Sequence, residues 1–167
     1  MEYKVMKKQE NSKKCFVCGL KNDFGLKASF YELENDELLA IFKPIDEHQS
    51  YPGRMHGGIA GAILDETIGR LIMAKDKNLF GVTVELNLKY KKPVPLDEEL
   101  RVVARITRDS RKLFEGSGEI LLKNGEVAVI GYGKYWKIPM HEMTEFDPEE
   151  QEWKVYSSDS DPLKIDI

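Results

Sequence analysis

The sequence has few of the features that mark membrane or secreted proteins. No run of 18 apolar residues occurs in its 167 residues, so we expect no membrane-spanning helix. Residues 1–14 are polar and contain lysines, without the apolar centre of a signal peptide. Cysteine is scarce, with two residues, and no internal repeat is visible. These absences predict one ordinary globular domain in the cytoplasm, with room for a core of its own.

A strong charge of one sign is also missing from most of the chain. Residues 141–167 hold nine acidic and two basic side chains, whereas the remainder holds 20 acidic and 23 basic ones. This small positive surplus is too weak to predict nucleic-acid binding. It would suit a small polyanionic ligand. We therefore expect neither a nucleic-acid partner nor a membrane partner.

The two cysteines, Cys15 and Cys18, lie in the motif C-F-V-C-G. Their spacing is compatible with half of a zinc site or with a redox pair. Because zinc normally takes four ligands, a second chain or a histidine such as His48 would have to complete the site. We favour a tight turn with partly buried thiols, and we expect no metal and no cofactor.

Residues 51–74 form the segment around which the chain is organised, and they predict a turn at Pro52-Gly53 followed by one buried helix that starts at Gly57 and Gly58. Apolar side chains occur nearly all the way round this helix, as expected for a helix that its own protein encloses. Two adjacent carboxylates, Asp65 and Glu66, interrupt its middle, which is unusual for such a helix. Asp65 shares one stripe with four small residues, Gly58, Gly61, Ala62 and Gly69. The stripe predicts either a seam of close packing or the floor of a narrow slot that contains an acid.

Six segments are predicted as strands around this helix. Two precede it and four follow it, at residues 25–31, 38–42, 82–90, 100–106, 113–122 and 127–136. Strict alternation in residues 82–90 predicts Val82, Val84 and Leu86 on one face and Thr83 on the other. Asn124-Gly125 predicts a hairpin between the last two strands.

The predicted order β-β-α-β-β-β-β leaves few ways to bury the helix. A curved antiparallel sheet wrapped around one central helix does so, which is the HotDog fold of the α+β class. We assign residues 15–138 to this domain, residues 1–14 to a flexible N-terminal arm and residues 139–167 to an acidic C-terminal tail. A single curved sheet also leaves an edge strand that a second copy would cover.

The start of the predicted helix has the chemistry of an oxyanion site. The first N–H groups of a helix lack intrahelical acceptors, and Gly57 and Gly58 place no side chain in front of them. Asp65 follows about 10–12 Å further along the helix, and its apolar neighbours are expected to raise its pKa. A raised pKa improves a carboxylate as a general base. We expect an extended acyl thioester to meet both groups, with its carbonyl at the glycines and the attacking water near Asp65.

The segment H-G-G-I-A-G-A-I-L-D-E-T, with the strand V-T-V-E-L-N-L-K-Y-K-K-P-V-P after it, resembles the HotDog thioesterases of the phenylacetate-degradation (PaaI-like) type. The likeness covers roughly residues 15–136. It implies an acyl-CoA thioesterase that forms a homodimer or homotetramer with active sites between subunits. In that family the acid, here Asp65, activates water or attacks the thioester, and the first glycine amide, here Gly57, polarises the carbonyl. A hydroxyl that the partner subunit donates holds the water, and Thr83 matches it.

Other positions are carried over from the resemblance or from their chemistry. His56 is expected to orient the loop rather than act as a general base. The family often has asparagine six residues before the histidine, whereas this chain has Ser50, with Gln49 beside it as a substitute. Substrate-binding roles, including contact with the phosphates of coenzyme A, are predicted for Ser50, Gly58, Arg54, Lys91 and Lys92.

Two other functions remain open at this stage. The first is a non-catalytic acyl-CoA binder or sensor on the same fold. The second is a HotDog enoyl-CoA hydratase or dehydratase, in which His48 or His56 would work with Asp65. Glu66 is the alternative to Asp65 as the working acid. The pattern favours hydrolysis of a small or medium acyl-CoA and does not predict which acyl group.

Overall fold

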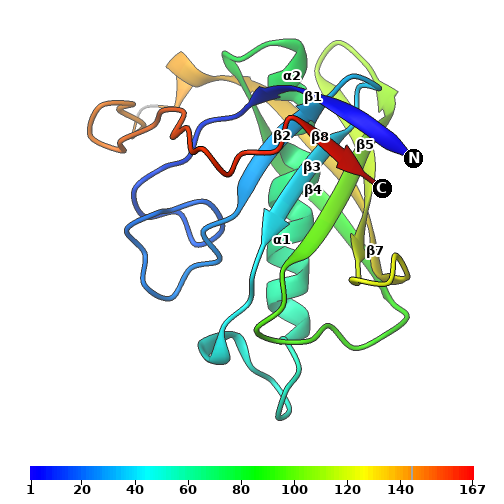
Figure 1. Cartoon of the computed structure of the whole chain (residues 1–167). Coiled ribbons are helices and arrows are strands. Elements are labelled where there is room, and N and C mark those ends of the chain that lie inside the picture. The colour runs from blue at the N-terminus through cyan, green and yellow to red at the C-terminus, as the bar shows by residue number, and fades with distance from the viewer. Residues whose placement is uncertain (144) are drawn as a thin grey trace.

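One sheet and one central helix make up most of the structure, a computed structural model that describes residues 1–143 and 145–167 (Figure 1). The strands are β1 (Glu2–Lys8), β2 (Ser29–Leu33), β3 (Leu38–Phe42), β4 (Leu79–Tyr90), β5 (Leu100–Asp109), β6 (Leu113–Leu121), β7 (Val127–Pro139) and β8 (Lys164–Asp166). The helices are α1 (Gly57–Gly69) and α2 (Leu71–Lys75), with short 3-10 turns η1 (Asp46–His48) and η2 (Met140–Glu142). Neither α-helix of the described chain has the length or apolar character to cross a membrane.

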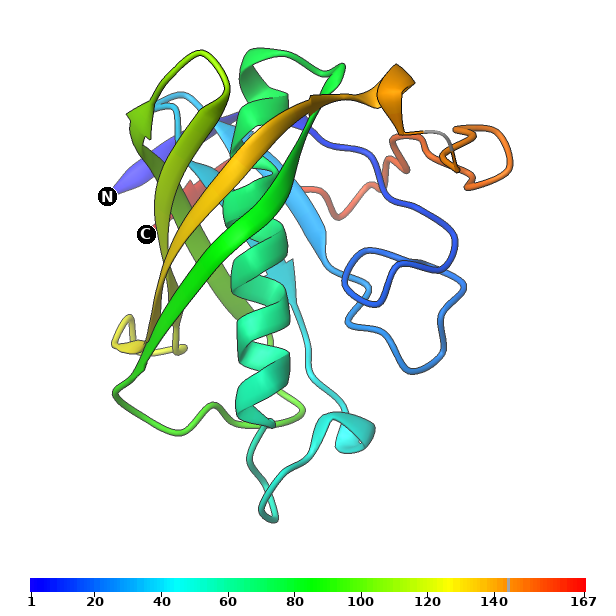
Figure 2. The same cartoon turned by 180° about the vertical axis from the view of Figure 1, so that it is seen from behind.

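The eight strands pair antiparallel in the order β4-β7-β6-β5-β3-β2-β1-β8, and the sheet curves around α1 (Figures 1 and 2). The core lies between the helix and the concave face of the sheet. Its largest fully buried apolar side chains include Phe30, Leu38, Ile63, Leu64, Ile68, Phe114, Ile120 and Tyr135. The predicted HotDog arrangement of the α+β class is therefore confirmed.

The predicted helix begins at Gly57, as expected, but it is divided into two helices. Residues 51–56 form a loop, and His56 is the N-cap of α1, accepting the Gly58 N–H at Nδ1 over 2.9 Å. The break between α1 and α2 falls at Arg70, directly after Gly69, where glycine weakens a helix. One face of α1 also stays partly exposed in the single chain, at Gly58, Ile59, Ala62, Asp65 and Glu66. The apolar pattern therefore overstates how completely the sheet encloses the helix.

The N-terminal segment, expected as a flexible arm, forms strand β1 between β2 and β8. Tyr3 and Val5 pack against a second apolar cluster that includes Tyr31, Leu33 and Ile165. Three lysines among the first eight residues hid this alternation of polar and apolar side chains in the sequence. The order of strands therefore begins and ends with one more strand than predicted.

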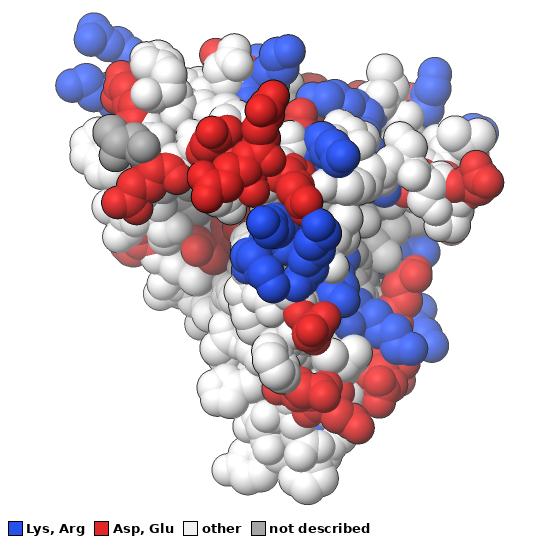
Figure 3. Space-filling model, turned by 90° about the vertical axis from the view of Figure 1, so that its left-hand side faces the viewer, with Lys and Arg blue, Asp and Glu red and all other residues white. Residues whose placement is uncertain are grey.

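The acidic tail is tied to the rest of the chain by several contacts. Lys8 pairs with Asp161 at 2.6 Å, and Lys21 pairs with Glu152 at 2.7 Å. Figure 3 shows acidic and basic side chains grouped side by side on one face of the molecule. Trp153 packs against the main core. The division into residues 1–14, 15–138 and 139–167 stays a prediction.

Strand β4 contains a β-bulge that breaks the predicted alternation. Thr83 pairs with Tyr135 and Glu85 with Lys134, so Val84 is the extra residue. Residues opposite each other in an antiparallel pair share a face, and Tyr135 points into the core. Thr83 therefore faces the helix together with Leu88, whose side chain contacts Gly61. The prediction that Thr83 and the leucines occupy opposite faces of β4 is wrong because of this one residue.

Candidate active site

Asp65 is held by two hydroxyl groups that come from two different strands. Thr83 on β4 donates through Oγ1 to both carboxylate oxygens of Asp65, at 2.9 Å to Oδ1 and 3.1 Å to Oδ2. Tyr135 on β7 donates its hydroxyl to Oδ1 at 3.0 Å. A carboxylate offers about four acceptor positions, so Oδ2 keeps capacity for a further donor such as water. The arrangement fixes the orientation of the carboxylate and leaves one of its edges available.

The surroundings of Asp65 raise its pKa above the ordinary value of 3.8. Burial is the main cause, and the neighbouring Glu66 charge adds to it, while the hydrogen bonds from Thr83 and Tyr135 lower the pKa. Burial and the nearby Asp65 charge also raise the pKa of Tyr135, so its phenol stays protonated and remains a donor. The predicted upward shift for Asp65 is confirmed in direction.

Sequence reasoning missed Tyr135. Its ring is fully buried and stacks on Phe114 with 5.1 Å between ring centroids. The signal was present, because alternation in β7 places Gly131, Gly133 and Tyr135 on one face of the strand. The two glycines pack against the helix or the tyrosine ring. That face was therefore the one directed at α1.

Thr83 and Asp65 make their contact within one chain, whereas the resemblance places this hydroxyl on a partner subunit. The helix runs close to β4 because glycines line this side of α1. A Cβ at Gly61 would lie 3.1 Å from Leu88, and one at Gly69 would lie 3.2 Å from the Tyr135 ring. The small-residue stripe is thus a packing seam, and the acid occurs within it opposite Thr83.

A cavity of about 490 Å³ adjoins Asp65. Its polar residues include Asp65, Glu66, Thr83 and Arg70. Much of its wall is apolar and comes from β4 and the C-terminal tail, with Phe80, Val82, Met143, Phe146 and Trp153. Phe80, Phe146 and Trp153 form an edge-to-face cluster with centroids 5.1–5.8 Å apart. This cavity offers an apolar chamber beside an oriented acid.

The start of α1 presents one free amide rather than two. The Gly58 N–H is engaged by His56 Nδ1, so the predicted substrate-binding role of the Gly58 amide does not fit the geometry. Within the described chain the Gly57 N–H has no acceptor, while the Gly57 carbonyl accepts the Tyr90 hydroxyl at 2.6 Å. His56 therefore acts as a cap, in agreement with the orienting role expected for it. The Gly57 N–H lies at the positive end of the helix dipole and is free to donate to a ligand.

A second cavity, of about 430 Å³, lies at this end of the helix. Its lining brings together four of the five predicted substrate-binding residues, Ser50, Arg54, Lys91 and Lys92, and also includes Gly57 and Tyr90. Lys92 also forms an ion pair with Glu126. Gln49, the expected substitute for asparagine, accepts the Gly53 N–H at 3.3 Å and is not part of this lining.

Gly57 and Asp65 line different cavities of one chain. Eight residues of α-helix separate them by about 12 Å. A water that attacks a carbonyl must lie about 3 Å from the same carbonyl whose oxygen the amide binds. The expectation that one acyl group meets both residues on a single helix is therefore wrong for one chain.

Among the described residues, neither His48 nor His56 pairs with Asp65. His48 is buried and its ring is engaged on both sides, accepting the Ile45 N–H at Nδ1 over 3.0 Å and lying 2.6 Å from the Phe24 carbonyl through Nε2. These contacts fix a neutral tautomer with the proton on Nε2. His56 caps the helix nine residues before Asp65. The histidine–acid pair of a hydratase is therefore not assembled within one chain.

Glu66 points away from Asp65 toward the cysteine turn. It forms an ion pair with the buried Arg70, with 2.8 Å from Glu66 Oε1 to Arg70 Nε. Hydrogen bonding between the two thiols lowers the pKa of Cys18 to about 6 and raises that of Cys15. Glu66 is thus engaged elsewhere, and Asp65 is the acid that faces the β4 hydroxyl.

Comparisons with known proteins agree with this fold. Residues 52–129 match the family model described as the thioesterase superfamily. The chain is 31% identical over 112 residues to acyl-coenzyme A thioesterase THEM4 of Rattus norvegicus, covering 65% of this chain and 47% of that protein. The matches thus span about half to two thirds of the length of such curated relatives.

Solved structures give the same result. The crystal structure of protein RHA08564, described as a thioesterase superfamily protein, superposes with a TM-score of 0.67 at 24% identity, covering 73% of this chain and 59% of that one. The BH2602 protein from Bacillus halodurans, solved with CoA, superposes with a TM-score of 0.55 at 25% identity, covering 60% of this chain and 66% of that one.

Proposed function

We propose that this chain, which matches the thioesterase superfamily model over residues 52–129, is a member of that family and hydrolyses the thioester of a small or medium acyl-CoA to a carboxylic acid and coenzyme A. The observation that carries this proposal is the Asp65 carboxylate, oriented by Thr83 and Tyr135 beside an apolar cavity. The cavity volume of about 490 Å³ lies within the usual range for small-molecule sites. The PaaI-like subtype is part of the proposal.

Asp65 acts as a general base that activates water. Direct attack of its carboxylate on the thioester is the alternative mechanism for the same residue. The carboxylate takes a proton from the water as its oxygen attacks the carbonyl carbon, and the C–S bond then breaks to release the coenzyme A thiol. The raised pKa makes the ionised Asp65 a stronger base than an exposed aspartate. Thr83 and Tyr135 are positioning residues, because they aim the carboxylate without touching the carbonyl.

The Gly57 N–H is the donor proposed for the oxyanion. It sits at the first position of α1, where the helix dipole favours developing negative charge. Since Gly57 and Asp65 of one chain are too far apart to share a carbonyl, we place the reaction between two copies. Antiparallel pairing of two α1 helices would bring Gly57 of one copy next to Asp65 of the other.

Strand β4 supports this pairing of two copies. It is the twelve-residue edge of the sheet, and Val82 and Val84 are 40% and 48% exposed on it. Long edge strands with exposed apolar side chains are usually covered. A homodimer joined along β4, alone or as half of a homotetramer, covers the edge and the exposed face of α1 together.

Arg54, Lys91 and Lys92 are proposed to bind the phosphates of coenzyme A. All three line the cavity that contains Gly57. A thioester whose carbonyl binds at Gly57 would therefore have its coenzyme A portion among these positive charges. The BH2602 structure with CoA and the acyl-coenzyme A thioesterase relatives support this choice of substrate.

Replacing Arg54 and Lys91 together with glutamine is expected to raise KM for acyl-CoA about tenfold and to leave kcat nearly unchanged. Each exposed ion pair contributes up to about 1 kcal/mol, and the contribution is made before the chemical step. Initial rates at several salt concentrations measure the effect, because the wild-type KM should rise with salt while that of the variant rises less. The matched control is Lys89→Gln near the end of β4, outside the cavity lining. An unchanged KM in the double variant contradicts the phosphate assignment.

Removing either hydroxyl that holds Asp65 should lower kcat about tenfold, since a hydrogen bond to a charged group contributes about 1.5–3 kcal/mol. Tyr135→Phe and Thr83→Val also remove contacts that lower the Asp65 pKa, so that pKa rises further. The base must be ionised, so the acidic limb of the kcat–pH profile should move to higher pH. Thr83→Ser keeps the hydroxyl and serves as the control. Its kcat–pH profile should have the same acidic limb as that of the wild type. A lowered kcat with an unmoved limb would indicate a purely structural role.

The activity itself is tested with a panel of acyl-CoAs and a thiol reagent that reports released coenzyme A. Release that depends on acyl chain length supports the hydrolase. Tight acyl-CoA binding without thiol release would instead identify a binder or sensor, and hydration of enoyl-CoA would identify a hydratase.

A further inference from the structure

The C-F-V-C-G segment forms a preorganised turn around the sulfur of Cys15. The backbone N–H groups of Val17 and Cys18 both point at Cys15 Sγ, with N···S distances of 3.4 Å. Gly19 is required, because a Cβ there would lie 2.4 Å from the Cys15 carbonyl oxygen. Asn11 holds the turn from outside by donating to the carbonyls of Cys18 and Ala28, each at 2.8 Å. Two sulfur atoms are thus fixed on one side of a rigid loop.

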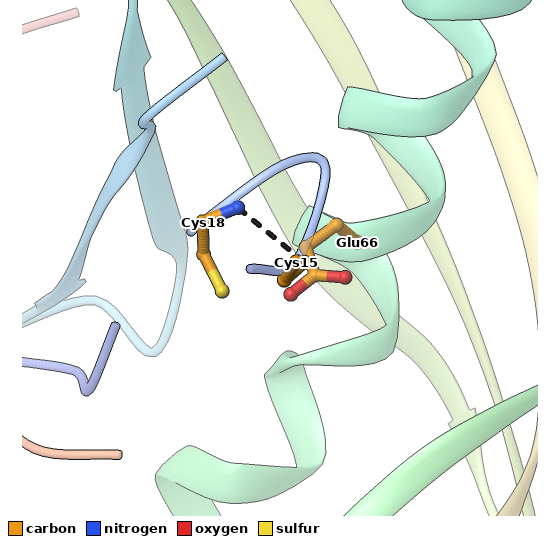
Figure 4. Close-up of side chains that lie close together, drawn as sticks. All are labelled: Cys15, Cys18 and Glu66. Carbon is orange, nitrogen blue, oxygen red and sulfur yellow. Dashed lines mark hydrogen bonds between the residues drawn. The ribbon is translucent and has the colours of Figure 1, made fainter. Parts of the chain in front are cut away.

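Helix α1 supplies a third ligand atom that the sequence analysis did not include. The two Sγ atoms and a carboxylate oxygen of Glu66 all lie within 4.8 Å of one another (Figure 4). Ligand atoms around tetrahedral zinc lie about 3.4–3.8 Å apart, from Zn–S of about 2.3 Å and Zn–O of about 2.1 Å. The largest separation exceeds these distances by at most about 1.0–1.4 Å, so small movements of the three side chains close the set.

The charges near these atoms balance for a divalent cation. Two thiolates and one carboxylate carry three negative charges, and the adjacent Arg70 returns one positive charge through its contact with Glu66 Oε1. Arg70 is 4% exposed, and its Nη2 has no hydrogen-bond acceptor among the described residues. A cluster with two remaining negative charges therefore matches the charge of Zn²⁺.

We propose that Cys15, Cys18 and Glu66 bind one Zn²⁺ ion, with its fourth coordination position open to the cavity that also contains Asp65. All three ligands line that cavity together with Asp65 and Thr83, so the open position faces the same space. His48, the histidine considered as a ligand from the sequence, is unavailable because both of its ring nitrogens have partners. Thiolate ligands select zinc over magnesium and calcium.

The proposal concerns metal binding and is independent of the proposed hydrolase activity. Three protein ligands and one open position leave room for a water or a thiol on the metal. The bound ion would also join the loop around residues 11–19 to α1, since its ligands come from both. Loss of acyl-CoA hydrolysis would therefore not by itself speak against the site, nor would zinc binding establish the activity.

The test uses the reduced full chain, stripped with a chelator and titrated with Zn²⁺ against a chromophoric competitor. We expect one ion per chain, and the Co²⁺ form should show thiolate-to-cobalt charge transfer with the intense d–d bands of tetrahedral coordination. Glu66→Gln should weaken Zn²⁺ binding at least tenfold, whereas Glu98→Gln, an exposed glutamate outside this cavity, should bind as the wild type does. Cys15→Ser should weaken the charge-transfer band, because one thiolate ligand is then left.

Several results would overturn the site. One is the absence of stoichiometric Zn²⁺ uptake by the reduced wild-type chain, a measurement that needs no variant to fold. Unchanged affinity in Glu66→Gln would remove the carboxylate from the ligand set. Weak octahedral Co²⁺ bands would exclude the tetrahedral geometry. Ready formation of a Cys15–Cys18 disulfide in a chain that takes up no metal would identify a redox pair instead.

Discussion

Asp65→Asn is expected to lower kcat for acyl-CoA hydrolysis by about 10²-fold or more, the scale typical of the loss of a general base. The amide keeps the size of the side chain and one oxygen that accepts from Thr83 and Tyr135, so the positions of both hydroxyls are preserved. What is lost is the ability to take a proton from water. Initial rates with the best acyl-CoA of the panel measure the effect.

The same substitution separates catalysis from stability. The folded-state pKa of Asp65 is raised, so the protonated form favours folding and that contribution is lost as the pH rises above this pKa. At pH values above this pKa the ionised carboxylate therefore costs stability, and the asparagine variant should melt there at the same temperature as the wild type or higher. Asp159→Asn, an exposed aspartate in the tail, is the matched control for activity. Near-normal turnover in the Asp65 variant removes this residue from the mechanism.

Mixing two inactive variants is expected to restore activity if the reaction takes place between two copies. Gly57→Val should be inactive, because its side chain covers the N–H and its Cβ lies 3.3 Å from the Tyr90 ring. A mixed dimer of Gly57→Val with Asp65→Asn has one site with an intact glycine from one copy and an intact acid from the other. Random pairing makes half of the dimers mixed, so about a quarter of wild-type activity should return.

Co-expression with two different affinity tags allows the mixed dimer to be purified and assayed directly. A site contained in one chain would leave the mixed dimer as inactive as its parents. Re-purified parent homodimers, assayed at the same concentration, provide the baseline. A chain that stays monomeric in solution would give no mixed species at all, and the proposed division of the site between copies would then be abandoned.

Much of the fold could be predicted from the sequence because its periodicities are strong. The apolar segment before Ala74 and the alternating segments after it allow few arrangements other than a sheet curved around a helix. Asp65 could be chosen because it is a carboxylate in a stripe of small residues. Its raised pKa followed from its apolar neighbours.

The errors have local physical causes. One extra residue at Val84 reverses the faces of β4, and a bulge leaves no mark in the pattern of apolar side chains. Tyr135 meets Asp65 across 70 residues of sequence, and Glu66 meets the two cysteines across about 50, so only the tertiary structure brings these groups together. The Gly58 amide does not belong to the site because its N–H donates to His56 Nδ1. This hydrogen bond depends on one torsion of the His56 side chain.

The bulge in β4 also bears on how sequences of this kind should be aligned. Removing Val84 would leave a regular strand in which Thr83 still lies opposite Tyr135, because the extra residue is the only departure from the pairing. A homologue with an unbulged strand would therefore carry the equivalent hydroxyl one position nearer to Leu86. Correct superposition of the two sequences requires a one-residue gap inside an otherwise ungapped strand, and an alignment scored on residue identity alone would place an aliphatic side chain against the hydroxyl.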